Sequence, residues 1–174
     1  MATNENIRNI QIKLKEEFTK SPDKALSKAK SNAKIGTGLV CTYSEGSRKT
    51  IMDMPNIAGG NNKGPTPGFH ARAAIAGCVA IGIKQEAIFR QIKCESVKVE
   101  LEMDFDDSAM FGIGENTAAP LDTRLLIKIV SDEGQKRLQN LVDRVLEIDP
   151  YFLALRDAQS VSAELKVFKI EDKN

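Results

Sequence analysis

Residues 64–83 read GPTPGFHARAAIAGCVAIGI, and this stretch decides the fold. Its first five residues hold two prolines and two glycines, a composition typical of a loop. From Ala73 to Ile83 every residue is apolar or a glycine, apart from the thiol of Cys78. Because a helix that is apolar on every face has to be buried, the sequence predicts a buried central helix over residues 69–91.

Cys78 is the chemically reactive side chain of this run, and two interpretations of it stay open. A thiol becomes a nucleophile when a cation, a helix N-terminus or a hydrogen-bond donor stabilises its thiolate. The single histidine, His70, lies eight residues earlier, about 12 Å along a helix axis. The local sequence therefore favours an unactivated, buried thiol, and a nucleophile would need a group from another element or another chain. The neighbours three and four positions away along the helix are all apolar: Ala74, Ile75, Ile81 and Gly82.

The sequence before the central helix predicts one helix and one hairpin. Apolar residues at helical spacing predict a helix over residues 5–19, and Pro22 closes it. Two extended segments, 38–44 and 48–54, flank a three-residue turn that contains a glycine, and we expect them to pair as a hairpin.

After the central helix, strict alternation of apolar and polar residues predicts a strand over 97–105 with one solvated face. A second strand is predicted over 121–130. A helix from a capping Ser131 to the residue before Pro150 follows, and alternation predicts a closing strand over 161–167. Strands that occur in pairs between helices indicate an α+β fold with antiparallel sheets.

Composition excludes several classes of protein. Lys plus Arg number 25 and Asp plus Glu number 24, and without a basic surplus nucleic acid is not an expected partner. The chain has no run of 18 apolar residues, so we expect no membrane span, and its first residues lack the pattern of a signal peptide. Three scattered cysteines and one histidine predict a reducing cytoplasm, no structural metal site and no cofactor.

The stretch from Gly64 to Cys78 resembles the signature of the OsmC-like family, which includes the organic hydroperoxide resistance proteins. The strand after that helix and the Asp149-Pro150 pair before the closing strand are similar to the family as well. The resemblance implies an intertwined homodimer in which antiparallel sheets wrap around two long central helices. It divides the chain into an N-terminal helical arm, residues 1–34, and an OsmC-like domain, residues 35–174.

The resemblance also implies thiol peroxidase chemistry, in which a cysteine reduces an organic hydroperoxide and a second thiol resolves the sulfenic acid. The peroxidatic cysteine matches Cys78, and Arg48 in the predicted hairpin matches the assisting arginine. Gly68 stands where such members of the family have a glutamate, and Asp149 stands where they have the second cysteine. Resolution would therefore need another cysteine of the chain or an external thiol reductant.

Three functions are compatible with these residues. The first is thiol-dependent reduction of organic hydroperoxides at Cys78. The second is a non-catalytic dimer that binds a small apolar ligand at the subunit interface. The third is a purely structural or partner-binding dimer.

Overall fold

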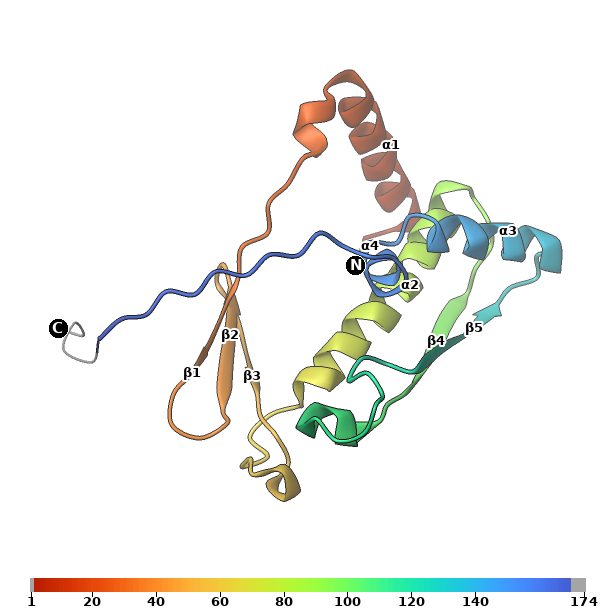
Figure 1. The fold of residues 1–174 in the computed structure, drawn as a ribbon. Coiled ribbons are helices and arrows are strands. Elements are labelled where there is room, and N and C mark those ends of the chain that lie inside the picture. The colour runs from red at the N-terminus through yellow and green to blue at the C-terminus, as the bar shows by residue number, and fades with distance from the viewer. Residues whose placement is uncertain (1, 170–174) are drawn as a thin grey trace.

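The computed structural model describes residues 2–169, and Met1 and residues 170–174 lie outside the described part. Helices and antiparallel strand pairs both occur, which confirms the predicted α+β class (Figure 1). In chain order the elements are α1 (Asn4–Lys20), β1 (Asn32–Ile35), β2 (Cys41–Glu45), β3 (Arg48–Met52), α2 (Pro67–Phe89), β4 (Ser96–Asp104), β5 (Asp122–Val130), α3 (Gln135–Leu146) and α4 (Pro150–Arg156), with short 3-10 helices at Pro22–Ala25, Asn56–Ala58 and Asp107–Phe111.

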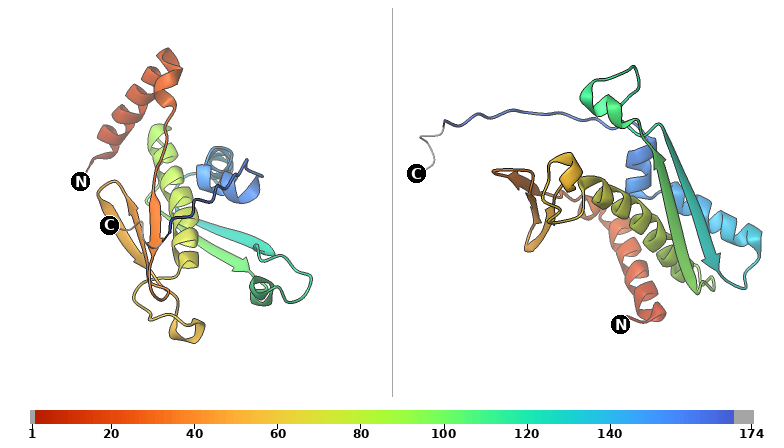
Figure 2. Two further views of the ribbon diagram at one scale, coloured as in Figure 1. Left: turned by 60° about the vertical axis from the view of Figure 1, so that its left-hand side comes forward. Right: turned by 90° about the horizontal axis from the view of Figure 1, so that it is seen from below.

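Helix α2 is the long element against which most of the molecule packs. It begins at Pro67, two residues before the predicted start, because proline fits the first position of a helix. Thr66 caps it, and its hydroxyl accepts a hydrogen bond from the amide of Phe69 at 3.2 Å. Helices α1, α3 and α4 and the β4–β5 sheet all contact α2 (Figures 1 and 2).

The hydrophobic core lies around the C-terminal half of α2. Its fully buried residues come from α2, from the turn that follows it and from α3: Val79, Ile83, Ala87, Ile92, Leu141 and Val145. The prediction that α2 is buried on every side is wrong for a single chain. Ala73 and Ala74 are exposed, and 60% of Ile81 is accessible, because no element within residues 2–169 covers that face.

Strands β4 and β5 form a two-stranded antiparallel sheet with the alternation that the sequence predicts. The register pairs Val97 with Ile129 and Val99 with Ile127, and these side chains pack against the core. On the opposite face Lys128 donates hydrogen bonds to Glu100 at 2.8 and 3.0 Å. The sheet therefore has one dry face on α2 and one charged face.

The predicted hairpin is present as β2 and β3, and β1 adds a third strand that the sequence pattern missed. Strand β1 pairs with β2 in antiparallel register, from Asn32 opposite Ser44 to Ile35 opposite Cys41. It spans the boundary expected at residues 34 and 35. Among the described residues this three-stranded sheet has no extensive packing against any helix, and Figure 2 shows it projecting away from the core.

Two predictions about the C-terminal third are wrong. Ser131 does not cap α3, which begins at Gln135, because its hydroxyl bonds the carbonyl of Lys93 and accepts from the amide of Glu133. Pro150 does not simply end a helix. It occupies the first position of α4, with Asp149 as the cap.

The predicted closing strand over 161–167 is also absent. Residues 158–169 run as an extended, exposed tail with no assigned secondary structure (Figure 1). Val161 and Leu165 are each 85% accessible. A strand is defined by hydrogen bonds to a neighbour, and the described part of the chain offers this tail none.

Candidate functional site at Cys78

Cys78 lies on α2 opposite the junction of α3 and α4, and it lines a cavity of about 410 Å³. The apolar walls come from three elements, and α1 contributes one polar side chain. The cavity is lined by Gln11, Cys78, Ile81, Gly82, Gln85, Glu86, Val145, Ile148, Asp149 and Pro150. Cys78 is partly buried, so it is a pocket residue rather than a fully enclosed core filler.

Asp149 is the acidic group that acts on the thiol, and only 4% of it is accessible. A tight turn at the end of α3 places it there, in which its amide donates to the carbonyl of Val145 at 2.8 Å. One carboxylate oxygen, Oδ1, accepts from the amides of Tyr151 at 3.1 Å and Phe152 at 2.8 Å. Asp149 therefore caps α4 and faces the central helix at the same time.

The surroundings of Cys78 work against a thiolate. Burial is the main cause that raises the pKa of the thiol, and the hydrogen bond to the Asp149 carboxylate and its negative charge raise the pKa further. The backbone amide of Tyr151 acts in the opposite direction. None of the described residues that line the cavity is basic. The thiol is thus held in its protonated form, in agreement with the unactivated thiol that the local sequence favours.

Gly82 lets the α3–α4 junction approach α2 closely. A Cβ at this position would lie 3.0 Å from Cγ1 of Val145 and 3.7 Å from Oδ2 of Asp149. The first distance is tighter than ordinary van der Waals contact, so a side chain here would push the junction, and Asp149 with it, away from Cys78. A glycine inside a helix lowers helix stability. The close contact with the α3–α4 junction is the physical reason why a glycine is present at position 82.

Gln11 reaches the cavity from α1, a position that sequence reasoning missed. Its Nε2 donates to the carbonyl of Gln85 at 3.1 Å, which fixes the orientation of the amide. Its Oε1 is buried and accepts no hydrogen bond. The helical arm therefore packs on α2 of its own chain. Arg8 reinforces the contact, since its Nε donates to the carbonyl of Phe89 at 3.2 Å.

The structure does not bring the other residues of the expected set to Cys78. Arg48 lies at the start of β3 and lines a separate cavity within the β2–β3 hairpin. Gly68 lies in the first turn of α2, where a Cβ would be 3.0 Å from Nη1 of Arg72. Within one chain, Cys78 thus meets Asp149 but neither a guanidinium nor the carboxylate expected at position 68.

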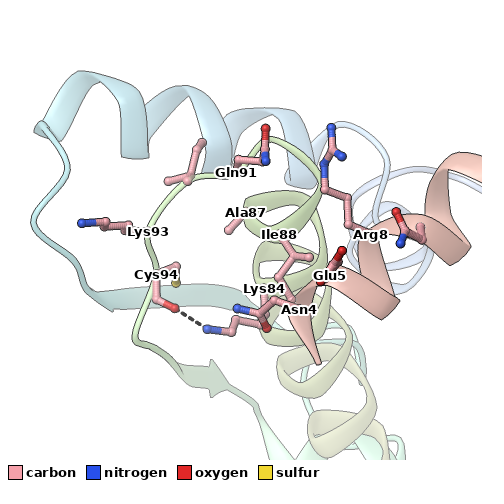
Figure 3. A pocket seen from close by; sticks show the side chains of 11 residues that line it. Asn4, Glu5, Arg8, Lys84, Ala87, Ile88, Gln91, Lys93 and Cys94 are labelled. Atoms are coloured by element: carbon pink, nitrogen blue, oxygen red, sulfur yellow. Dashed lines mark hydrogen bonds between the residues drawn. The ribbon is translucent and has the colours of Figure 1, made fainter. Parts of the chain in front are cut away.

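A somewhat larger cavity, of about 480 Å³, lies between the start of α1 and the end of α2 (Figure 3). Three basic residues line it, but their side chains point in different directions (Figure 3). Lys84 donates to the carbonyls of Cys94 and Glu95, and Arg8 donates to the last turn of α2. Lys84 and Arg8 thus satisfy carbonyl oxygens at and beyond a helix C-terminus, so this cavity is less suited to chemistry than the smaller one.

Asp53 organises the loop that leads into α2. Its side chain is almost fully buried. It accepts hydrogen bonds from the amides of Met54 at 2.8 Å and of Asn61 and Lys63 at 3.0 Å each. These backbone donors, the amide of Lys63 first, hold the pKa of the Asp53 carboxyl below its ordinary value. The asparagines and glycines of this loop thus serve a structural turn.

Comparisons with known proteins identify the family. The sequence model of the protein family described as "OsmC-like protein" matches residues 60–164. The chain therefore belongs to the OsmC-like family. No curated protein matches. In the described part of the chain no helix is long and apolar enough to cross a membrane, and no group of three or more metal-binding side chains occurs.

Solved structures with the same fold cover about three quarters of the chain. An OsmC-like protein from Mycoplasma pneumoniae has a TM-score of 0.63 at 15% identity and covers 75% of this chain and 88% of its own. An organic hydroperoxide resistance protein OsmC from Legionella pneumophila has a TM-score of 0.57 at 23% identity, and the match covers 75% of this chain and 90% of that protein. An organic hydroperoxide resistance protein from Elizabethkingia anophelis has a TM-score of 0.53 at 17% identity, and the match covers 75% of this chain and 89% of that protein. At these identities the similarity establishes the fold.

Proposed function

We propose that the protein binds a small, largely apolar organic molecule in the cavity beside Cys78 and does not turn it over rapidly. The observation that carries this proposal is the lining of the cavity, where the Cys78 thiol and the buried Asp149 carboxylate share one space with no basic side chain of the described residues. A peroxidatic cysteine must be a thiolate, and a neighbouring carboxylate favours the protonated thiol. A cavity of about 410 Å³ with aliphatic walls is in the size range of small-molecule sites.

Binding that does not depend on the sulfur is the test. We expect the Cys78→Ala variant to keep its affinity for a small neutral probe such as 1-hexanol within about threefold, measured by chemical-shift changes of the backbone amides of α2 and of residues 145–150. A filling mutation, Ile148→Trp, is the matched variant that should abolish the shifts. If the probe shifts neither region in the wild type, the protein does not bind such molecules here.

Thiol-dependent reduction of organic hydroperoxides is the second candidate. It is favoured by a thiol that lines a cavity, and by similar structures that are named organic hydroperoxide resistance proteins. The thiol would lose its proton and attack the distal oxygen of the hydroperoxide. The O–O bond would break, and the products would be Cys78 sulfenic acid and an alcohol, with an external thiol as the reductant.

Intact mass with a sulfenic-acid trap separates the two candidates. The binding proposal predicts that Cys78 stays unmodified at hydroperoxide concentrations that oxidise free cysteine. Rapid trapping at Cys78, lost in Cys78→Ser, would support the peroxidase. Loss of that reaction in Arg48→Met would support a contribution of Arg48 from a second chain.

A homodimer in a reducing compartment such as the cytoplasm completes the proposal. Within the described part of the chain the three-stranded sheet has no extensive packing on a helix and the tail is unpaired, and Phe69 and Ile81 of α2 are more than half exposed. A second copy would cover these surfaces. All three cysteines are free thiols.

A further inference from the structure

We propose that the ligand of the Cys78 cavity carries an ammonium group on an apolar chain and that Asp149 binds this ammonium; the inference rests on the proposed binding function. It concerns the class of ligand, a small primary or secondary organic amine. The charge, the burial and the hydrogen bonds of the residues around the cavity all support it.

Asp149 is a buried carboxylate without a cation. It is 4% accessible, and no Lys, Arg or His of the described residues forms an ion pair with it. Its Oδ1 accepts from two backbone amides of α4. Among the described residues no backbone amide bonds Oδ2, and the neighbour that the carboxylate has in the cavity, the Cys78 thiol, is neutral. Oδ2 lies on the side of α2, near Gly82. A buried charge is stable when it is paired, and a cationic ligand would supply the missing partner.

The other polar groups of the cavity are mostly acceptors as well. Glu86 contributes a second carboxylate, which is already paired with Arg90 at 2.6 Å. Gln11 has its donor engaged by the carbonyl of Gln85 and its Oε1 buried without a partner. A ligand that brings hydrogen-bond donors satisfies these groups, whereas a carboxylate or phosphate would meet like charge and no basic residue.

The remaining walls select an organic cation rather than a metal ion. Ile81, Val145, Ile148 and Pro150 line the cavity with aliphatic carbon. Asp149, a protonated thiol and a Glu86 carboxylate that is already paired with Arg90 fall short of the ligand set that Ca²⁺ or Zn²⁺ requires. An alkyl or arylalkyl chain would bury its carbon against these side chains while the ammonium lies against Asp149.

Three probes with the same six-carbon chain test the inference: hexylamine, 1-hexanol and hexanoate, titrated into the reduced protein at pH 7 by calorimetry and by amide chemical shifts. We expect hexylamine to bind at least tenfold more tightly than hexanol, and hexanoate to bind most weakly. Asp149→Asn keeps an oxygen that caps α4 and removes the charge, so it should abolish the preference for the amine and leave hexanol binding intact.

Two further variants keep the test decisive. Asp149→Ser is a second uncharged helix cap, in case the asparagine variant does not fold. Glu147→Gln removes a charge from an exposed position two residues away and should leave the preference unchanged. Equal binding of amine and alcohol, or a preference that survives in Asp149→Asn, would overturn the inference and leave the binding proposal standing. If none of the three probes binds, the binding proposal itself fails.

Discussion

At the scale of single residues, the state of Cys78 is decided by a residue 71 positions away. The family resemblance implies a nucleophile at Cys78 and a second thiol at position 149, where this chain has Asp149, a hydrogen-bond acceptor with a negative charge. The same carboxylate caps α4. An aspartate at this position therefore has two consequences: it offers no second thiol, and it raises the pKa of Cys78.

Asp149→Asn should lower the pKa of Cys78. A raised pKa means that little thiolate is present at neutral pH and that reactivity appears only as the pH rises toward the raised value. Removing the charge shifts this profile to lower pH, and we expect iodoacetamide to modify Cys78 about three- to tenfold faster at pH 8. Peptide mapping of the alkylated protein measures the rate.

Cys94 is the internal control for this measurement. Its pKa is raised by burial, and Asp149 is not among the causes, so its rate should be the same in both proteins. A Cys78 rate profile that does not move in Asp149→Asn would contradict the assigned role of the carboxylate.

Gly82→Ala tests the close approach of the α3–α4 junction. The added Cβ would lie 3.0 Å from Val145, which is 2% accessible and has no room to move freely. We expect a loss of about 1–2 kcal/mol in the free energy of unfolding, more than the gain in helix propensity. Chemical denaturation measures it.

The double variant with Val145→Ala identifies the clash as the cause. Val145→Ala alone should cost about 1–3 kcal/mol because it opens a cavity. The pair should cost clearly less than the sum of the two single changes, since each relieves the other. Additive losses would show that the two positions do not compete for the same space.

At the scale of elements, local chemistry decides where helices begin and how loops are held. Thr66 and Pro67 start α2, and Asp149 and Pro150 start α4, each as a capping residue followed by a proline at the first helical position. The loop before α2 has a different support, the buried carboxylate of Asp53. Three backbone amides of the loop donate hydrogen bonds to this carboxylate and hold the glycine- and asparagine-rich segment in a defined structure.

Asp53→Ala should loosen this loop without unfolding the core. The amides of Asn61 and Lys63 lose their acceptor, so their hydrogen exchange should accelerate at least tenfold, while amides of β4 stay protected. Because the pKa of Asp53 is lowered, the wild-type loop should keep its protection as the pH falls to the ordinary pKa and lose it only as the pH passes through the lowered value. Asp107→Ala, in the 3-10 helix between β4 and β5, serves as the control and should leave both amides unchanged.

At the scale of the whole molecule, one chain leaves several apolar surfaces uncovered. The N-terminal half of α2, the three-stranded sheet and the tail all expose aliphatic side chains. In the tail the apolar residues alternate with polar ones, so one edge-paired strand would bury them together. A second copy of the chain is the partner that we propose for these surfaces.

Leu165→Asp should weaken the dimer by at least tenfold in dissociation constant. The side chain is 85% accessible in the single chain, so the substitution costs the isolated chain little, and any large effect must arise from a second chain. Light scattering across a dilution series measures the equilibrium. Glu164→Ala, on the opposite face of the tail, should leave it unchanged; a protein that is monomeric at all concentrations would refute the dimer.

The sequence by itself determined the elements whose pattern is local. Helical spacing predicted α1, strict alternation predicted β4, a further strand was predicted at β5, and the run from Ala73 to Ile83 predicted α2. The family resemblance followed from residues 64–78. These features depend on residues that are near one another in the chain, which is why a pattern reveals them.

Only the tertiary structure decided what surrounds the thiol. Asp149 and Gln11 are 71 and 67 residues from Cys78, and their approach depends on the packing of α1 and of the α3–α4 junction on α2. Whether residues 161–167 form a strand also depended on the tertiary structure. An alternating pattern is necessary for a strand, but the hydrogen bonds that make it one come from a neighbouring chain segment, and a sequence pattern does not contain that neighbour.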